Sequence, residues 1–480
     1  MSSGRRTSDQ RLYILLSVIC AGVLGYSQAT ILDWDEGFHL IAASMMMAGK
    51  RPYIDFCFPQ PWLHVVWNAS WVRLSSGWRG PHLAAALLSC GAIVLTAVFV
   101  RRRVDVERWG VMPAIIAALI VGLNSEVVTF GTKAQAYGAC MFLTFAAYCT
   151  AIARAAWFRS AAAGCLAGIA AGCSLLAAPA AIVLLLWTFR HRGWRHALAM
   201  ISGILVASIP LIVSLAEAPY QTWFNLVAYH VLYRRASWTG ATKHDVLVVL
   251  MWAGSGQALV LVILAAFGFR YVRGSAWDAA RKAEFYLAAW LAAGLGIEAA
   301  VAHPTFPQYF VLAVPFVAIL AAPGFCDLTS RISVRPRLSV AALACVLLSN
   351  LGKSLIEMHD GNETWADMQS VASKIRQVTP DRASILADPP VYFALRLLPP
   401  SGMEFPASHA LEMPAPQAAV LHIVPQSVLE KRVRAGEFAT VQTCRGDEDE
   451  VKALGLPRLY SRSFTIADCQ VYWNFKRGID

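Results

Sequence analysis

Residues 12–39 read LYILLSVICAGVLGYSQATILDWDEGFH, an apolar run that ends in two adjacent carboxylates, Asp35 and Glu36. The apolar part is long enough to cross the hydrocarbon core of a bilayer as an uncleaved helix. Ionised groups are costly to bury or crowd where a membrane helix meets water. The acidic pair is therefore the first candidate for chemistry in the chain.

The whole chain has the composition of a mainly α, polytopic membrane protein. Of its 480 residues, 57% are hydrophobic and only 15% are charged, which lies far from the average of soluble domains. We expect about 11 transmembrane helices, a count that the short sixth run and Pro179 leave open by about one or two. The predicted spans lie at about 12–31, 82–100, 110–128, 135–153, 160–176, 177–189, 197–216, 246–269, 285–302, 306–324 and 338–356.

Most Lys and Arg residues between these spans fall on one side of the membrane if the N-terminus is cytoplasmic, as the positive-inside rule requires. An odd number of spans then places the segment after residue 356 on the outer, extracytoplasmic side, together with Asp35 and Glu36. This topology accounts for the formal net charge of +11, so nucleic-acid binding is not needed to explain it. We expect an inner or plasma membrane protein.

Two outer loops are long enough to carry a site. The first, at about 32–80, contains two short apolar stretches, 41–48 and 62–72, which we expect to be helices lying in the membrane interface. The second, at about 217–245, combines aromatic with basic residues. This combination suits a negatively charged headgroup, and it also suits an ordinary aromatic belt.

The segment 357–480 is predicted to be a small α/β domain, whereas residues 1–356 are predicted to form the transmembrane catalytic domain. Strand-like runs at 383–387, 418–424 and 470–473 alternate with helix-like runs at 364–377 and 426–434. Cys444 and Cys469 can pair as a disulfide in an oxidising compartment, although spacing alone does not fix the pairing.

The sequence contains no P-loop, GxGxxG, HExxH or Cys/His cluster. An ATP-driven pump, or a nucleotide-sugar enzyme with a cytoplasmic binding domain, therefore has no support. If the protein is an enzyme, its activated substrate is expected to arrive in the lipid.

The run Asp35-Glu36-Gly37, followed by Gly49-Lys50-Arg51-Pro52-Tyr53-Ile54-Asp55, resembles the first outer loop of the GT-C glycosyltransferases. The nearest branch by pattern is that of the protein mannosyltransferases and aminoarabinose transferases. The stretch from His303 to Pro315, with Tyr309 and Phe310, is similar to a late loop of this family, and the glycine-rich stretch 163–176 is a weaker match. The resemblance implies a polyprenyl-phosphate-linked sugar as donor and a lipid, polysaccharide or protein as acceptor.

Asp35 suits the role of base in such a reaction, because an inverting transfer needs a group that takes the proton of the acceptor hydroxyl. Its alternative role is the N-cap of the next helix. Glu36 can orient the acceptor, hold a metal or cap that helix. Asp55 is a candidate for substrate contact or for turn chemistry, and His39 and His64 are interpreted as packing residues.

The leaving group is a phosphate, which cationic or hydrogen-bonding side chains would stabilise. The candidates on the outer side are Arg234, Arg235, Lys50, Arg51, Lys133, Lys243, His303 and Tyr309. Arg234 and Arg235 rank first, because they lie in the aromatic loop and oppose the positive-inside trend.

Many members of the family carry a second acidic residue between the third and fourth spans. The stretch 129–136 of this chain has none, and Glu126 lies just upstream. Either Glu126 takes that role or the second acid is absent. A divalent metal at Glu36 or Glu126 is thus the one cofactor left open.

A transporter or flippase of a lipid-linked glycan is the alternative from a different functional class. A transporter should carry functional polar residues near the bilayer midplane, whereas here they gather at the outer boundary, with Glu298 as the main exception. A membrane-anchored assembly protein, the third possibility, would leave Asp35 and Glu36 without a task. We therefore predict a membrane glycosyltransferase.

Overall fold

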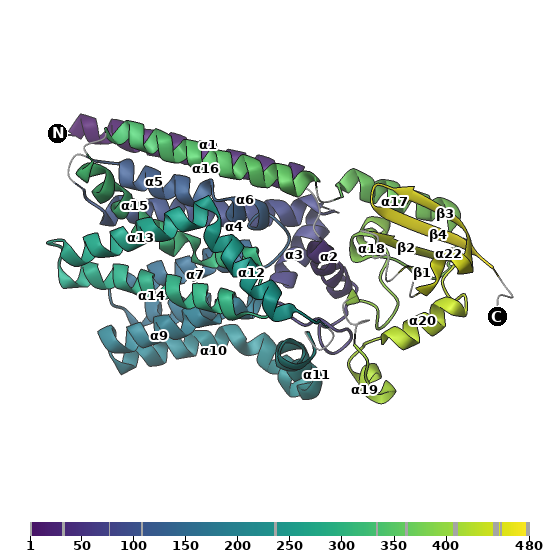
Figure 1. Cartoon of the computed structure of the whole chain (residues 1–480). Coiled ribbons are helices and arrows are strands. Elements are labelled where there is room, and N and C mark those ends of the chain that lie inside the picture. The colour runs from purple at the N-terminus through teal and green to yellow at the C-terminus, as the bar shows by residue number, and fades with distance from the viewer. Residues whose placement is uncertain are drawn as a thin grey trace. The chain divides into compact units, whose positions relative to one another are not determined.

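Figure 1 presents the computed structural model, which describes residues 2–30, 34–75, 77–106, 109–234, 238–332, 335–360, 363–406, 411–444, 451 and 454–476. The chain divides into two compact units. Unit 1 consists of Met1–Thr30, Pro81–Ile212 and Trp238–Glu357, and unit 2 consists of Ile31–Gly80, Val213–Ser237 and Met358–Asp480. The first outer loop and part of the second therefore group with the C-terminal segment, which the predicted boundary after residue 356 did not anticipate.

Unit 1 is helical throughout the part that the structure describes. Its helices are α1 (Ser2–Ala29), α4 (Arg79–Arg103), α5 (Met112–Gly122), α6 (Ser125–Phe130), α7 (Tyr137–Ile152), α8 (Trp157–Cys173), η1 (Leu175–Ala177), α9 (Ala178–Arg192), α10 (Trp194–Glu217), α12 (Ala241–Gly254), α13 (Gly256–Gly274), α14 (Ala279–Val301), η3 (Pro307–Ala313), α15 (Val314–Arg331) and α16 (Pro336–Asp360). Among the described residues, 8 helices are long and apolar enough to cross a membrane, and α5 and α7 are shorter apolar helices. Each predicted span overlaps helix, but the one at 110–128 is divided between α5 and α6 and the one at 246–269 between α12 and α13. The helix at the predicted span 160–176, α8, is not among these membrane candidates.

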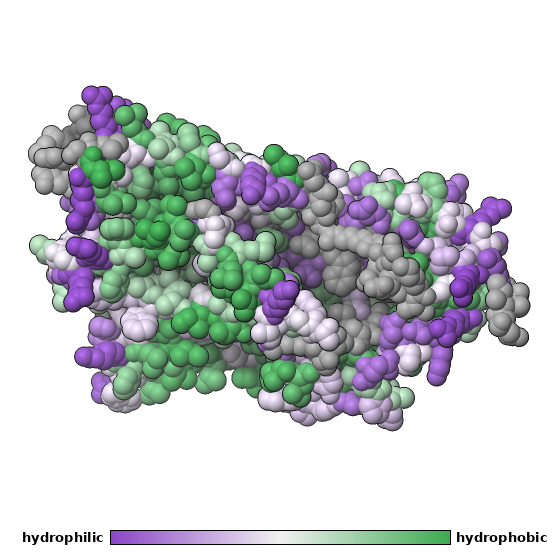
Figure 2. Space-filling model, viewed as in Figure 1, coloured by the Kyte–Doolittle hydropathy of each residue, from purple (hydrophilic) through white to green (hydrophobic). Residues whose placement is uncertain are grey.

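Large apolar side chains are exposed along the long helices of unit 1, and Figure 2 shows this apolar surface. Leu186 of α9, Ile209 of α10 and Trp290 of α14 are 63%, 52% and 68% exposed. A soluble protein rarely leaves so much apolar surface in water, whereas lipid accepts it. The chain is an integral membrane protein, as predicted.

Glycines let two pairs of these helices pack backbone against backbone. A Cβ atom on Gly203 of α10 would lie 1.9 Å from the carbonyl oxygen of Ala161 in α8. A Cβ atom on Gly268 of α13 would lie 1.8 Å from the carbonyl oxygen of Leu320 in α15. Small residues at helix crossings are typical of membrane proteins, because lipid provides no hydrophobic force between helices and close packing must replace it.

Unit 2 combines helices with one sheet. Its helices are α2 (Trp34–Met47), α3 (Leu63–Ser75), α11 (Pro219–Trp223), the π-helix η2 (Phe224–Tyr233), α17 (Trp365–Val378), α18 (Pro389–Leu395), α19 (Ala415–Val420), α20 (Gln426–Arg434) and α22 (Leu456–Leu459). Its strands are β1 (Ile385–Leu386), β2 (Thr440–Cys444), β3 (Tyr460–Ile466) and β4 (Cys469–Phe475). They form a 4-stranded sheet in the order β1-β2-β4-β3, with β1 and β2 parallel and the other pairs antiparallel.

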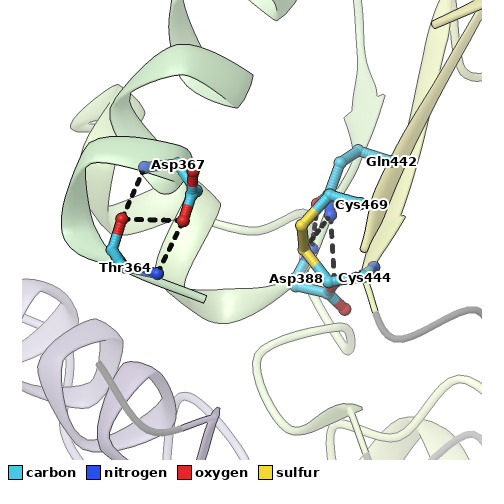
Figure 3. The surroundings of a disulfide bond; sticks show 6 residues. All are labelled: Thr364, Asp367, Asp388, Gln442, Cys444 and Cys469. Carbon is cyan, nitrogen blue, oxygen red and sulfur yellow. Dashed lines mark hydrogen bonds between the residues drawn. A yellow bond between two sulfur atoms is a disulfide. The ribbon is translucent and has the colours of Figure 1, made fainter. Parts of the chain in front are cut away.

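The structure confirms some predicted elements of the C-terminal segment and contradicts one. The helices at 364–377 and 426–434 are α17 and α20, and β1 and β4 lie in two of the predicted strands. Thr364 and Asp367 begin α17 with a reciprocal capping box, drawn in Figure 3. The strand predicted at 418–424 is wrong, because Ala415–Val420 is α19, and its alanines favour a helix.

A disulfide joins Cys444 of β2 to Cys469 of β4, as Figure 3 shows. Beside it, the carboxylate of Asp388 accepts hydrogen bonds from the backbone nitrogen of Cys444 at 2.8 Å and from the side-chain amide of Gln442 at 3.0 Å. Asp388 directly precedes α18. These bonds therefore attach the start of α18 to the sheet.

Candidate functional site

The acidic pair lies in the first turn of α2, where negative charge interacts favourably with the helix dipole. Asp35 is the second residue of the helix, so it does not occupy the N-cap position considered for it. The side chain of Asp35 is exposed, whereas Glu36 is completely buried. Of the two carboxylates, Asp35 is thus the one that a substrate can reach.

Gly37 brings α2 into direct contact with α18. A Cβ atom at this position would lie 2.5 Å from the Cδ atom of Pro390, closer than carbon atoms approach without repulsion. The glycine after the acidic pair is therefore required by packing. Because α18 is attached to the sheet through Asp388, this contact fixes the start of α2 within unit 2.

We predict that Gly37→Ala lowers the thermal unfolding midpoint of the detergent-solubilised protein. Overpacking against Pro390 should cost about 1–3 kcal/mol. The matched control is Gly296→Ala in α14, where a Cβ atom meets nothing within 4 Å and alanine should leave the midpoint unchanged or raise it. If Gly37→Ala and the unaltered protein had equal unfolding midpoints, the close contact between Gly37 and Pro390 would be contradicted.

Four rings, which we call the aromatic cluster, connect α2 with two other segments of unit 2. Phe38 stacks on Phe58 with ring centroids 4.8 Å apart and lies 5.1 Å from Phe405, which in turn lies 5.3 Å from Tyr229. Aromatic pairs at such distances contribute energy beyond their buried area. The cluster therefore holds the first outer loop, η2 and the C-terminal segment together.

Two polar side chains from the second outer loop hold the middle of the first, at Phe58 and Pro59. The side-chain oxygen of Asn225 accepts from the backbone nitrogen of Phe58 at 2.8 Å, and its nitrogen donates to the carbonyl of Gln221 at 2.8 Å. His230 donates from Nε2 to the carbonyl of Pro59 at 2.7 Å. Burial, assisted by the charge of Arg234, lowers the pKa of His230 to about 4, so this histidine is neutral at pH 7.

Arg234 follows the last residue of η2 and its side chain is half-buried. Its backbone nitrogen donates to the carbonyl of Tyr229 at 2.7 Å, which closes the π-helix. π-Helical segments occur frequently at functional sites. Arg235, the other first-ranked cation, lies outside the described residues.

Arg51 and Asp55 close the turn that the resemblance singled out. The carboxylate of Asp55 accepts from the backbone nitrogen of Arg51 at 2.7 Å and pairs with its guanidinium at 3.4 Å. The guanidinium also contacts Glu217 at 3.1 Å. These contacts support turn chemistry for Asp55, the alternative considered for it. Lys50 is exposed beside this turn.

His39 and His64 are buried and hydrogen-bonded to each other, with Nδ1 of His39 2.8 Å from Nε2 of His64. Burial, together with the neighbouring His64, holds the pKa of His39 well below its usual value. Their burial and mutual hydrogen bond fit the interpretation as packing residues.

Glu404 is a buried carboxyl group that sequence reasoning missed. It is 3% exposed, and its Oε2 atom accepts from the backbone nitrogen of Gly402 at 2.7 Å. Burial raises the pKa of Glu404 to about 7, against the opposing effects of backbone hydrogen bonds and the charge of Lys50. A buried carboxyl with such a pKa marks a functional candidate, and it directly precedes Phe405 of the aromatic cluster.

The raised pKa of Glu404 predicts a pH-dependent stability. The folded protein keeps the proton of the Glu404 carboxyl up to a higher pH than the unfolded chain, which releases it near pH 4.5. The contribution of this proton to the free energy of unfolding is therefore fully present below pH 4.5. It is lost as the pH rises through about 7. Glu404→Gln should therefore make the free energy of unfolding fall less as the pH rises through this window. At pH 8 the variant should have a free energy of unfolding higher than that of the unaltered protein by about 2–3 kcal/mol.

Glu437→Gln is the control of opposite sign. Its hydrogen bond with Arg432 lowers the pKa of Glu437, so its contribution is present above the ordinary pKa and lost as the pH falls. This variant should lose stability at pH 8 and not at low pH. If the stability of Glu404→Gln depended on pH in the same way as that of the unaltered protein, the prediction that the folded protein buries Glu404 in its neutral form would be wrong.

The remaining candidates lie in unit 1. Nδ1 of His303 contacts the carboxylate of Asp245, which also accepts from the backbone nitrogen of Thr305 at 2.8 Å. The carboxylate thus fixes the orientation of the imidazole. Lys243 is exposed two residues before Asp245 in the first turn of α12.

Lys133 and Tyr309 are both buried. The Lys133 ammonium lies 5.2 Å from the ring centre of Phe130, and the Tyr309 ring lies 6.2 Å from that of Tyr137. Glu126 belongs to the first turn of α6, and its Oε2 atom is buried without a hydrogen-bond partner in the described part of the chain. A metal at Glu126 or Glu36 stays a prediction.

Unit 2 thus contains the acidic pair with Lys50, Arg51, Asp55 and Arg234, and unit 1 contains Lys133, Lys243, His303 and Tyr309 with Glu126. Sequence reasoning missed Glu404, Asn225 and Asp245. No motif surrounds them. Asn225 and Glu404 are single polar residues with aromatic neighbours in the sequence, whereas Asp245 follows Lys243 and His244 and has no such signal.

No protein-family model and no curated protein sequence matches the chain. Solved structures do match it. ArnT from Cupriavidus metallidurans bound to undecaprenyl phosphate superposes with a TM-score of 0.68 at 17% identity, over 96% of this chain and 97% of ArnT. The chain has the GT-C fold. The resemblance inferred from the acidic pair and the turn at 49–55 therefore predicted the fold correctly.

Two further structures support this fold. ArnT in the apo state gives a TM-score of 0.68 at 16% identity, over 97% of this chain and 98% of ArnT. The Archaeoglobus fulgidus oligosaccharyltransferase in the apo form gives 0.53 at 11% identity, over 93% of this chain and 71% of the oligosaccharyltransferase. The likeness to ArnT includes the C-terminal segment, which none of the motifs that carried the sequence resemblance reaches.

Proposed function

We propose that the chain is a membrane glycosyltransferase that transfers a sugar from a polyprenyl-phosphate carrier to an acceptor on the outer face of the membrane. The observation that carries the proposal is the exposed Asp35 carboxylate at the start of α2 in a chain of this fold. The ArnT structure, which has undecaprenyl phosphate bound, supports a carrier of that chemical class. The positive-inside pattern supports the outer face.

In the proposed reaction, the oxygen of an acceptor hydroxyl attacks the anomeric carbon of the donor sugar. Asp35 takes the hydroxyl proton as the new bond forms. The bond between the anomeric carbon and the phosphate oxygen breaks, and the carrier phosphate leaves with the bonding electrons. The exposure of Asp35 supports its role, because the base must reach the acceptor hydroxyl.

Glu36 is proposed to be a positioning residue. Its complete burial in the first turn of α2 favours support of this turn over contact with the acceptor. Gly37 serves the same purpose from the next position, because it lets α2 pack directly on Pro390. Together they would hold Asp35 in one place relative to unit 2.

Arg234 is our first candidate for the cation that faces the leaving phosphate. Negative charge accumulates on that phosphate as the bond breaks, and a fixed cation stabilises it. Asn225 accepts a hydrogen bond from the first outer loop and His230 donates one to it, so the two anchor η2 there. The residue at the end of η2 is therefore well positioned. Lys50 is the second candidate in unit 2.

The test of the base is Asp35→Asn, expressed in cells that lack the natural copy and checked for correct membrane insertion. Loss of a general base should reduce sugar transfer by roughly 10²–10⁴-fold, measured by mass spectrometry of the cell-surface lipids, polysaccharides and proteins. Asp468→Asn, in the exposed turn between β3 and β4, is the matched control and should retain activity.

Full transfer by Asp35→Asn would refute the role of Asp35 as base. Vectorial movement of an intact lipid-linked sugar, with no new glycosidic bond, would refute the transferase function and identify a transporter.

The test of the cation uses undecaprenyl phosphate as the probe. Arg234→Ala should bind it roughly ten to a hundred times more weakly, because a charge-assisted hydrogen bond is lost, and Arg234→Lys should be intermediate. Binding is measured with the purified protein in detergent. Arg73→Ala, an exposed arginine in the last turn of α3, should bind as the unaltered protein does. Equal affinity for Arg234→Ala would assign the phosphate to another residue.

A further inference from the structure

The chain turns back on itself where the helix α10 ends. α10 is long and apolar enough to cross a membrane, and it ends at Glu217. The hydroxyl of Thr222 in α11 donates to the carbonyl oxygen of Ser214, eight residues earlier, at 2.9 Å. In a continuous helix these residues would be separated by about 12 Å along the axis. The segment 219–233, which consists of α11 and η2, therefore leaves the direction of α10.

A pair of charged side chains marks the level of this turn. The guanidinium of Arg51 contacts the carboxylate of Glu217 at 3.1 Å, and both side chains are exposed. Charged groups are costly in hydrocarbon, so the pair belongs at the depth of water or of lipid headgroups. Because α11 begins at Pro219, two residues after Glu217, the segment 219–233 begins at the membrane surface.

The segment has the composition of a lipid contact. Residues 219–233 contain no Asp, Glu, Lys or Arg, whereas a stretch of this length in a soluble protein carries about four charged residues. Its histidine, His230, does not face outward, because it donates a hydrogen bond to the carbonyl of Pro59 in the first outer loop. A segment that lay in water would not need to be free of charge.

The segment packs one side on unit 2 and exposes large apolar side chains on the other. The packed side contains Phe224, Asn225 and Tyr229, which are buried. The other side, which we call the apolar face, consists of four side chains between 45% and 69% exposed: Tyr220, Trp223, Val231 and Leu232. Contiguous apolar groups on a surface indicate contact with a partner or with lipid.

Two observations favour lipid as the partner. The apolar face follows directly on the end of α10, where Val213 and Leu215 also expose apolar side chains. The hydroxyl of Tyr220 accepts a hydrogen bond from the side-chain amide of Gln417 in α19 at 2.7 Å, while its ring is exposed. Tyr and Trp rings with one satisfied polar end and one apolar surface are typical of the boundary between membrane and water.

We propose that the apolar face binds the lipid of the leaflet in which α10 ends, so that the segment 219–233 lies along the membrane surface as an interfacial anchor of unit 2. The inference does not depend on the transfer reaction. It adds a reason for the position of Arg234, because η2 ends directly before this residue and an η2 that lies on lipid holds Arg234 near the depth of lipid phosphates.

The test places the photoreactive residue p-benzoylphenylalanine at Trp223 or at Val231 in the full chain, reconstituted into vesicles of phosphatidylcholine. On illumination its ketone inserts into a C–H bond that it touches. Both variants should gain the mass of one phosphatidylcholine molecule, measured by mass spectrometry of the intact protein. Ile209 of the membrane helix α10 and Val428 of α20, which are 52% and 39% exposed, are the matched controls. The first should gain the lipid mass and the second should not, because α20 carries charged residues along its length.

The possible products separate lipid from the other partners of such a face. If either variant gave no lipid adduct while the Ile209 control did, the apolar face would lie in water and the inference would be wrong. A crosslink to another part of the chain or to a second copy, in place of lipid, would also overturn it, because the face would then be a contact between protein surfaces. None of these readouts requires sugar transfer, so a failure of the proposed function would leave them unchanged.

Discussion

The contact between α2 and α18 at Gly37 is the constraint on which the candidate site depends. With no side chain at this position, the backbone of α2 lies directly on the ring of Pro390, and Phe38 beside it enters the aromatic cluster. Asp388 then ties α18 to the sheet near the disulfide. Asp35, the residue that we propose as the base, thus lies on a helix whose packing extends to the last strands of the chain.

Buried polar groups in this protein fall into two kinds. Asn225 and the histidine pair His39 and His64 are hydrogen-bonded within the protein, and they hold loops together. Gln135 is equally buried and has no hydrogen-bond partner in the described residues. A buried polar atom without a hydrogen bond costs free energy, so the first kind stabilises the fold and the second does not.

Sequence reasoning found the residues that stand in a pattern. The acidic pair at the end of an apolar run was recognisable because charge is costly there, and helices at 364–377 and 426–434 followed from their periodicity. Glu404 and Asp245 were not recognisable. Each is an ordinary acidic residue in its own stretch and becomes distinctive through burial or through a partner distant in sequence, such as His303 for Asp245.

The sequence by itself determined the membrane-spanning helices, because a helix in lipid must satisfy its backbone within one continuous apolar run, and such runs are local. It also made Asp35 the leading candidate for a catalytic base. Only the tertiary structure decided that the first outer loop belongs with the C-terminal segment, and that Asp35 is exposed while Glu36 is buried. Those outcomes depend on contacts between segments hundreds of residues apart, which no local pattern records.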